Sequence, residues 1–520
     1  MLIKVRSALN NGLDTIEIDV EVNFNNKGLP GFDIVGLAGK AVSESKQRVR
    51  AALVNCGFEF PAAKIMVNLA PGDVPKDGAF YDLPIAAAVI SHMTGHKIPR
   101  NALFYGELSL NGDTRHTKGT LLLSLFAKEK KIKHIFIPRE SANEAAIVAG
   151  VKVYPVDSLT CLCAHLSGDM LIEPTEYIEE DENTVSENEF DMSEVLGQEQ
   201  AKRAVEIAAA GGHNFLMVGS PGSGKTMLAR AIPGILPQMR EKESLEVTKI
   251  YSASGRIPPG GSIIRTRPFR SPHHTISAVG LIGGGAKPQP GEISLAHRGV
   301  LFLDEFNEFP RSVIEAMRQP MEDGRLTISR SQDRATYPSR FMLIASANPC
   351  NCGFLYDPKK QCTCTEREIE RYKKRVSGPI IDRIDLHVDV PVVEIEKFAM
   401  DFRNSKTGKP QINSKNENIK SETSEQIRER VQSAREIQSE RFANDTIFTN
   451  AEMKNKHIKK YCKLSKEVED LLQKAAKAMN LSGRSYFKMI KIARTIADIA
   501  GAEEIELNHM AEALQYRPKM

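Results

Sequence analysis

A glycine-rich run between an apolar stretch and a helix-forming stretch constrains this chain more than any other feature. Residues 219–226, Gly-Ser-Pro-Gly-Ser-Gly-Lys-Thr, fit the pattern G-x-x-x-x-G-K-[ST] without a gap. Glycines let successive backbone N–H groups curl around a β-phosphate, and a helix N-terminus adds the positive end of its dipole. Strand, loop and helix in this order predict a nucleotide phosphate site, formed by Gly219, Ser220, Pro221, Gly222, Ser223, Gly224, Lys225 and Thr226.

An acidic motif follows further along the chain. Residues 298–305, Arg-Gly-Val-Leu-Phe-Leu-Asp-Glu, are typical of a buried parallel strand that ends in two acids. Acids at that end of a strand lie where ligands bind in open α/β sheets. We expect Lys225 to neutralise the β- and γ-phosphates of a nucleotide. Thr226 and Asp304 are expected to hold Mg²⁺, and Glu305 to polarise the attacking water. ATP and Mg²⁺ are therefore the expected cofactors of an ATP hydrolase.

Three later residues resemble functional positions of AAA+ ATPases. Asn348 ends an apolar run, as does the sensor-1 residue that orients water near the γ-phosphate in that family. Arg383 resembles the arginine finger that one subunit offers to its neighbour, and Arg484 resembles sensor 2 in the lid, with Arg494 as the second choice. The alternatives are an Asn that begins a turn and, for Arg383, a surface salt bridge.

Two insertions resemble those of the AAA+ branch that holds magnesium-chelatase ATPases and MCM helicases. One spans residues 267–297, and the other, 324–340, has two strand-like runs around a polar turn. The resemblance implies that both project toward the pore of a ring. Positive charge there suits a phosphate backbone, which makes the candidate DNA contacts Lys287, Arg330 and Arg334. Solvated turn charges are the alternative. His273 and His274 lack a Cys or carboxylate at metal spacing, so we expect them to be structural or near the nucleotide.

Four of the eight cysteines fall within fifteen residues. They form two C-x-C pairs, Cys350 with Cys352 and Cys362 with Cys364. Zinc prefers four such thiolates in a tetrahedral shell, although C-x₂-C is the usual spacing. A structural zinc site, free thiols and a redox switch therefore stay open as alternatives.

Residues 1–165 predict a separate α/β domain, because alternating and continuous apolar runs of strand length are interleaved with helical spacing. Residues 67–84 resemble the proteolytic domain of Lon proteases. Phe80 stands where that family has its Ser nucleophile, and Leu121 where it has its Lys. The resemblance implies a Lon-like, non-proteolytic domain. Its role stays open between a structural one and contact with nucleic acid.

Charge and periodicity predict the remaining boundaries. Residues 166–191 are acidic without Lys or Arg, which favours an extended linker. Residues 192–395 carry the nucleotide motifs and predict a parallel sheet with helices on both faces. Residues 396–425 are polar and without period, which indicates a loop. Residues 426–520 have helical spacing and predict a helical lid.

Composition excludes some classes of protein. With 520 residues the chain is too long for one core. It has no apolar run of the roughly 20 residues that a membrane span needs. Its N-terminus lacks the apolar core of a secretion signal, so we expect a cytoplasmic protein without a membrane partner. The net charge of +4 is weak evidence for any partner.

Taken together, these segments resemble the bacterial YifB/ComM proteins, named magnesium-chelatase-like. The resemblance implies an ATP-driven homo-oligomeric ring, a hexamer, that moves on DNA junctions or single strands. Branch migration in recombination or natural transformation is the implied function. One alternative is a magnesium-chelatase-type motor or protein-remodelling ATPase that works with a partner subunit. Another is an ATP-dependent protease, which Phe80 argues against.

Overall fold

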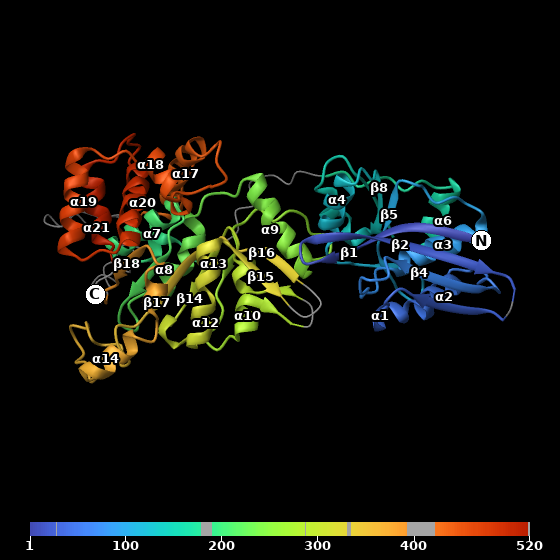
Figure 1. The fold of residues 1–520 in the computed structure, drawn as a ribbon, viewed down its shortest axis with the longest axis horizontal. Coiled ribbons are helices and arrows are strands. Elements are labelled where there is room, and N and C mark those ends of the chain that lie inside the picture. Colours follow the sequence, from blue (N-terminus) through green and yellow to red (C-terminus); the bar gives the residue numbers. More distant parts are fainter. Residues whose placement is uncertain (28, 178–189, 286–287, 330–333, 393–421, 518–520) are drawn as a thin grey trace, which may run out of the picture.

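The computed structural model describes residues 1–520 apart from 28, 178–189, 286–287, 330–333, 393–421 and 518–520. An N-terminal α/β domain, a core with a parallel sheet and a helical C-terminal region follow one another along the long axis of the molecule (Figure 1). The predicted α/β fold with a helical C-terminal region is therefore confirmed at this level. None of the helices in the described part of the chain combines the length and apolarity needed to span a bilayer.

The N-terminal domain is built on a mixed sheet of seven strands in the order β3-β4-β2-β1-β5-β8-β9. Its strands are β1 (Leu2–Asn11), β2 (Asp14–Asn25), β3 (Gly31–Val35), β4 (Lys64–Ala70), β5 (Ala102–Phe104), β8 (His134–Pro138) and β9 (Lys152–Val156). Its short strands are β6 (Glu107–Leu108) and β7 (Thr114–Arg115). Its helices are α1 (Lys40–Ser43), α2 (Ser45–Asn55), α3 (Asp82–Thr94), α4 (Thr120–Glu129), α5 (Ala142–Ala146) and α6 (Leu159–Ser167). Helix α3 is buried along most of its length and forms the centre of the core.

Packed side chains fill the two positions that the resemblance to Lon proteases assigns to a nucleophile and a lysine. Phe80 stacks on Tyr105 with ring centroids 4.4 Å apart. Leu121 is fully buried in α4. Neither side chain has a group that could attack a carbonyl or move a proton.

The acidic linker begins later than its composition predicts. Helix α6 includes the first residues of the predicted linker, and Ile172 is buried against the domain. The Thr175 amide donates at 2.7 Å to the carbonyl of Val153, a residue of β9. Apolar residues and backbone pairing therefore hold residues 166–177 on the domain despite their acidic neighbours. The rest of the predicted linker, up to residue 189, lies outside the described residues.

The core sheet has five parallel strands in the order β11-β14-β17-β10-β18. They are β10 (Phe215–Val218), β11 (Phe269–Arg270), β14 (Val300–Leu303), β17 (Met342–Ala347) and β18 (Leu386–Asp389). Phe215 and Met217 pack into one apolar cluster, and Leu216 packs into another. Alternate residues of β10 thus face helices on opposite sides of the sheet, as predicted.

The core also contains the following helices, of which α14 lies apart from the sheet at the lower left of Figure 1. They are α7 (Glu199–Gly211), α8 (Lys225–Ala231), α9 (Glu241–Ser254), α10 (Ala278–Ile282), α11 (Glu292–Leu295), α12 (Arg311–Ala316), α13 (Arg318–Asp323), α14 (Glu366–Lys373) and α15 (Gly378–Ile381). Short 3₁₀ turns are η1 (Arg139–Ser141) in the first domain, and η2 (Met192–Glu194), η3 (Ile232–Ile235) and η4 (Phe306–Glu308) here.

The two predicted insertions each contain a β-hairpin. The hairpins are β12 (Gly283–Gly284) with β13 (Gln289–Pro290), and β15 (Arg325–Ser329) with β16 (Arg334–Pro338). The Tyr337 hydroxyl donates to the Pro288 carbonyl at 2.7 Å and joins the two insertions. Leu13, in the β1–β2 turn of the first domain, packs against Ile328 and Tyr337. The N-terminal domain therefore contacts the β15–β16 hairpin through Leu13.

The C-terminal region is helical, as predicted. Its elements are α17 (Ser424–Arg441), η5 (Asn450–Glu452), α18 (Asn455–Tyr461), α19 (Lys466–Ala478), α20 (Gly483–Ile499) and α21 (Leu507–Gln515). Helix α17 begins just before the predicted boundary because the Thr423 side chain caps its first turn. Most of the predicted loop 396–425 lies outside the described residues.

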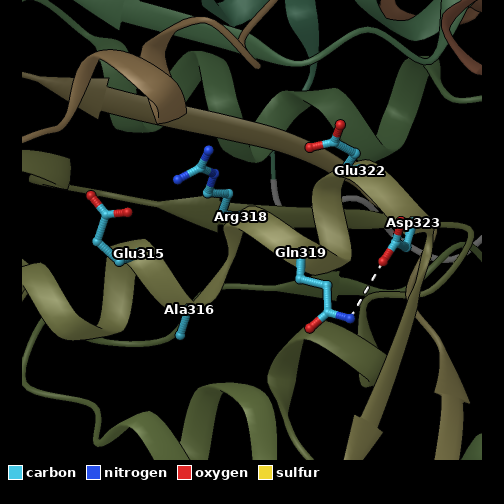
Figure 2. A pocket seen from close by; sticks show the side chains of 6 residues that line it. All are labelled: Glu315, Ala316, Arg318, Gln319, Glu322 and Asp323. Carbon is cyan, nitrogen blue, oxygen red and sulfur yellow. Dashed lines mark hydrogen bonds between the residues drawn. The ribbon is translucent and has the colours of Figure 1, made fainter.

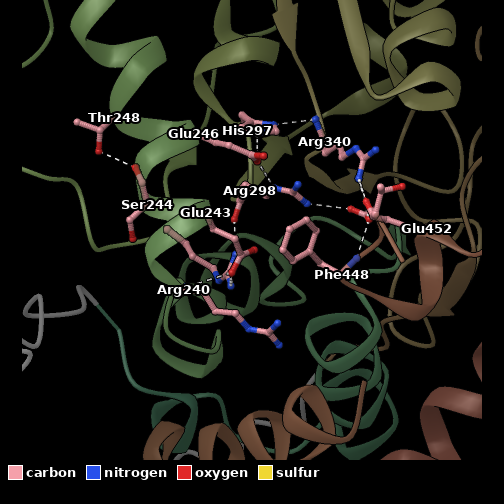
Figure 3. Close-up of polar contacts among 12 residues, drawn as sticks. Arg240, Glu243, Ser244, Glu246, Thr248, His297, Arg298, Arg340, Phe448 and Glu452 are labelled. Carbon is pink, nitrogen blue, oxygen red and sulfur yellow. Dashed lines mark hydrogen bonds and ion pairs between the residues drawn. The ribbon is translucent and has the colours of Figure 1, made fainter. Parts of the chain in front are cut away.

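A network of charged side chains fastens the helical region to the core (Figure 3). Arg298, just before β14, donates to Glu246 at 2.9 Å and to Glu452 at 3.0 Å. Its guanidinium lies 4.3 Å from the centre of the Phe448 ring. Arg340, before β17, donates to the same Glu452 at 2.9 Å. Because Arg298 is buried, loss of one acid would leave its charge uncompensated.

Candidate nucleotide-binding site

The glycine-rich loop joins β10 to α8 at the carboxyl edge of the sheet. Gly222 and Gly224 have φ values of +78° and +85°, which glycine adopts without steric cost. The Gly219 amide donates to the carbonyl of Ala347 at the end of β17, at 3.1 Å. A side chain at Gly219 would collide with the carbonyl of Val390, 2.3 Å from its Cβ. The loop is therefore anchored to two neighbouring segments.

Lys225 lies inside the loop. Its ammonium donates to the carbonyls of Gly219 and Ser220 at 2.7 and 2.9 Å, and its distance to Asn348 Oδ1 is 3.4 Å. Burial lowers the pKa of Lys225, and the nearby acids Asp304 and Glu305 oppose that shift. A buried ammonium that faces backbone carbonyls suits an anionic phosphate as an additional partner.

Thr226 and Asp304 come together although they are far apart in the sequence. The Thr226 hydroxyl donates to Asp304 Oδ2 at 2.8 Å. The Ser346 hydroxyl and the Glu305 amide both donate to Asp304 Oδ1. A hydroxyl and an oriented carboxylate are oxygen ligands of the kind Mg²⁺ takes beside nucleotide phosphates. The donor set therefore fits the magnesium ion that the sequence predicts.

Glu305 is half exposed and contacts a histidine. Its backbone lies in the left-handed region with φ +53°, which is uncommon for a residue other than glycine. His274 Nδ1 is 3.2 Å from Glu305 Oε2. The His273 ring lies against the His274 ring, with centroids 4.0 Å apart. Of the two expectations for this pair, structural or near the nucleotide, the contact with Glu305 favours the second.

Sequence reasoning missed the contacts of Ser346 and His274. Strand pairing explains both, because β11 and β17 are the two neighbours of β14. Residues that follow the ends of β11 and β14 meet at one edge of the sheet. No signal in the sequence pointed to His274, because β11 has only two residues, Phe269 and Arg270, and forms no apolar run. Ser346 was hidden inside the buried run of β17.

Arg383, the candidate finger, is buried and lies near the same carboxylate as Arg484, the first sensor-2 candidate. The Arg383 guanidinium donates to Glu322 of α13 and, at 2.6 Å, to the carbonyl of Pro379. Arg383 lowers the pKa of Glu322, and Arg484 and Arg318 contribute to the same shift. The three arginines therefore surround one carboxylate, and Arg484 is exposed in the first turn of α20.

A hollow of about 400 Å³ lies beside this group (Figure 2). Side chains of α12 and α13 line it, among them Glu315, Arg318 and Glu322. It has no P-loop residue in its lining. It is an open hollow rather than a closed ligand pocket.

Arg494, the second choice for sensor 2, serves another purpose. It is buried in α20 and donates to Asp498 at 3.0 Å and to the carbonyls of Ala502 and Glu503. Its guanidinium thus caps the C-terminal end of α20. All of these partners belong to the lid, so the contacts of Arg494 are those of a structural residue and favour Arg484 as the sensor-2 candidate.

The four clustered cysteines meet in space. Cys350 Sγ is 3.4 Å from Cys352 Sγ and 3.8 Å from Cys362 Sγ, and the sulfurs of all four, including Cys364, lie within 4.8 Å of one another. A tetrahedron with Zn–S bonds of about 2.3 Å has edges of about 3.8 Å, whereas a disulfide needs about 2.05 Å. Backbone hydrogen bonds from Phe354 and Thr363 lower the pKa of Cys352 to about 5. The arrangement fits four-coordinate zinc.

Only one of the three candidate DNA contacts can be placed. Arg334 is exposed at the start of β16. Lys287 and Arg330 lie outside the described residues. The paired strands of both hairpins are described, β12 with β13 and β15 with β16.

Family models of magnesium chelatase cover most of the chain. "Magnesium chelatase, subunit ChlI" matches residues 191–398, "Subunit ChlI of Mg-chelatase" residues 20–141, and "Magnesium chelatase, subunit ChlI C-terminal" residues 421–517. The three matches coincide with the core, the N-terminal domain and the helical region.

Two individual relatives match this chain over nearly its whole length. The chain is 39% identical to competence protein ComM of Haemophilus influenzae, over 99% of this chain and 97% of that protein. It is 39% identical to YifB of Escherichia coli, over 99% and 96%. The magnesium-chelatase 38 kDa subunit of Rhodobacter capsulatus is 26% identical over 31% of this chain and 50% of that subunit. The P-loop geometry, the three family matches and these identities agree, and the chain belongs to the YifB/ComM family, AAA+ ATPases with magnesium-chelatase ChlI-like domains.

Proposed function

We propose that this protein is a Mg-ATP-driven ring motor that acts on DNA junctions or single strands and drives branch migration in recombination or natural transformation. The observation that carries the proposal is 39% identity over 99% of the chain to a competence protein. Its ChlI-type ATPase domain implies hydrolysis of ATP with Mg²⁺.

The nucleotide site supplies the chemistry. Lys225 binds the β- and γ-phosphates, and Thr226 and Asp304 hold Mg²⁺, which neutralises charge on the phosphate oxygens. Glu305 polarises the attacking water, and His274, 3.2 Å away, orients the Glu305 carboxylate. Asn348, which lies beside the Lys225 ammonium, orients the water near the γ-phosphate.

A neighbouring subunit completes the site. Arg383 and Arg484 both lie near the Glu322 carboxylate. No P-loop residue is among their described hydrogen-bond partners. Stabilisation of transition-state charge by an arginine from another subunit is a known device of nucleotide hydrolysis. We assign both arginines to the nucleotide of the adjacent subunit in a homo-oligomer, a hexamer.

The remaining parts serve DNA and assembly. Lys287, Arg330 and Arg334 contact the phosphate backbone from the two insertions. The N-terminal domain, up to residue 177, has a Lon-type fold without the protease dyad and braces the second hairpin through Leu13. Cys350, Cys352, Cys362 and Cys364 hold a structural zinc ion, for which their sulfur distances are suited.

The test is the steady-state ATPase rate without DNA and with single strand, duplex or four-way junction, each at two salt concentrations. We expect stimulation that is largest with the junction and that falls as salt rises, because phosphate contacts release counterions. Glu305→Gln protein is the control for contaminating ATPases. A rate that ignores every form of DNA contradicts the proposal.

A magnesium-chelatase-type motor that works with a partner subunit is the second candidate. The matched segment of the Rhodobacter capsulatus chelatase subunit favours it. The same ATPase measurement separates the two candidates, since a chelatase-type motor responds to its protein partner and not to DNA.

A further inference from the structure

The cysteine-rich segment lies directly against the nucleotide loop. Gly353, one residue after Cys352, has φ +83°, and a Cβ placed on it would come within 2.6 Å of the Pro221 ring. Pro221 is the third residue of the glycine-rich loop. Gly353 is buried, so the backbone of the cysteine segment and the P-loop meet with no room for a side chain.

A second connection runs through Asn348. Asn348 lies two residues before the buried Cys350 and 3.4 Å from the Lys225 ammonium. The Gly353 amide donates to the Cys350 carbonyl at 3.0 Å and closes a tight turn between the two contacts. The first cysteine pair is thus held between two parts of the candidate nucleotide site, Asn348 on one side and Pro221 on the other.

This turn belongs to a segment without regular secondary structure. Residues 349–365, all of which the structure describes, contain no helix or strand. Asp357 caps a local turn by accepting from the amides of Lys359 and Lys360. Ordering such a segment costs conformational entropy that needs a compensating interaction. The Cys352 amide donates to Cys364 Sγ at 3.4 Å, and the Lys360 ammonium lies 4.7 Å from the centre of the Phe354 ring. The second pair therefore meets the first at the sulfur cluster and near one cation–π contact.

We propose that zinc bound by Cys350, Cys352, Cys362 and Cys364 braces the nucleotide loop, so that zinc occupancy sets nucleotide affinity. The metal fixes the turn, and the turn fixes Pro221 and Asn348. The inference rests on the proposed zinc site and on the phosphate-binding role of the P-loop, but not on the action on DNA.

The first arm of the test measures zinc and nucleotide binding on the same protein. Zinc is quantified by inductively coupled plasma mass spectrometry, and affinity by titration with a fluorescent non-hydrolysable ATP analogue in Mg²⁺ buffer. We expect one zinc per chain and an affinity that falls at least about tenfold after chelation. Zinc, but not further Mg²⁺, restores the affinity. Cys362→Ser loses both zinc and affinity, whereas Cys161→Ser, a thiol of α6 outside the cluster, keeps both.

The second arm of the test changes the contact between the cysteine segment and the P-loop without removing a zinc ligand. Gly353→Ala leaves all four thiols in place but adds a methyl group against Pro221. Gly57→Ala is the matched control, because Gly57 has φ +84° and a Cβ placed on it would meet no atom within 4 Å. We expect Gly353→Ala to weaken nucleotide binding several-fold while the fold melts at a temperature close to that of Gly57→Ala. Pro221→Ala in the Gly353→Ala background should show coupling between the two sites in a double-mutant cycle.

Three results would overturn the inference. They are a protein without zinc, an affinity that chelation does not change, and wild-type affinity in Gly353→Ala. Stimulation of the ATPase by junction DNA is measured independently. If nucleotide affinity does not depend on zinc but junction DNA stimulates the ATPase, the role of zinc is refuted and the proposed function stands. If affinity depends on zinc but no DNA stimulates the ATPase, the proposed function is refuted and the role of zinc stands.

Discussion

At the scale of single residues, the site is organised around Asp304. Three donors hold its carboxylate, the hydroxyls of Thr226 and Ser346 and the Glu305 amide. Hydrogen bonds to an ionised carboxylate are about twice as strong as neutral ones. The carboxylate is therefore oriented by the protein itself, which reduces the reorganisation required when Mg-ATP binds.

His274 gives a prediction at this scale. His274→Ala removes the group that orients Glu305, so we expect kcat for ATP hydrolysis to fall about tenfold with little change in nucleotide affinity. Steady-state kinetics and a binding titration measure the two effects. In a Glu305→Gln background the same change should have no further effect. If His274→Ala lowers kcat about tenfold in the Glu305→Gln background too, His274 does not act through Glu305.

His387 gives a prediction on pH. Burial and the nearby Lys488 lower the pKa of His387 in β18 to about 4, whereas an unfolded histidine has a pKa of about 6.5. Between these values the unfolded state binds more protons, so stability falls as pH falls. The loss from this group at pH 5 is about 2 kcal/mol. His387→Gln should flatten the fall in thermal unfolding temperature between pH 7 and pH 5, and an unchanged fall would contradict this assignment.

At the scale of elements, the strands and their ends explain what could be predicted from sequence. The P-loop and the acidic motif are local patterns, each next to an apolar run that forms a strand, and both lie where expected. The contact of His274 with Glu305 depends on which strands are neighbours, which no local pattern contains. Likewise, the burial of Ile172 depends on the domain beneath it, so composition alone predicted a linker there.

The contact between the β1–β2 turn and the β15–β16 hairpin gives a prediction for elements. Gly12 approaches Ala335 so closely that a Cβ on it would lie 2.7 Å away, and Leu13 packs on the hairpin. Leu13→Asp removes about 1 kcal/mol of apolar contact. We expect faster hydrogen–deuterium exchange in residues 325–338, measured by mass spectrometry.

The matched control is Leu29→Asp. Leu29 belongs to the same domain but is 88% exposed, so its replacement should leave exchange of the hairpin unchanged. Equal exchange in Leu13→Asp and wild type would show that the N-terminal domain does not restrain the hairpin.

At the scale of the whole molecule, the three units are linked in series (Figure 1). Leu13 connects the N-terminal domain to the hairpin, and the cysteine segment meets the P-loop at Gly353. Arg298 ties the strand of the acidic motif to the helical region through Glu452 (Figure 3). Packed and charged contacts thus join the core to both the N-terminal domain and the helical region.

A site shared between subunits gives the prediction for the assembly. Arg383→Ala protein should bind ATP but hydrolyse it at least about a hundredfold more slowly, because the neighbour's γ-phosphate loses its arginine. Lys225→Ala protein should not bind ATP but should still offer Arg383. Mixing the two inactive proteins should restore part of the ATPase rate. A mixture that stays inactive would count against a site completed by the neighbour.

Branch migration of a mobile four-way junction measures the central claim most directly. The junction carries a fluorophore and a quencher on arms that separate as the branch point moves, and the signal is followed with ATP, without ATP and with a non-hydrolysable analogue. We predict movement that requires ATP hydrolysis and is lost in Lys225→Ala and Glu305→Gln. An ATPase-active protein that leaves the junction unmoved under all three conditions would contradict the account.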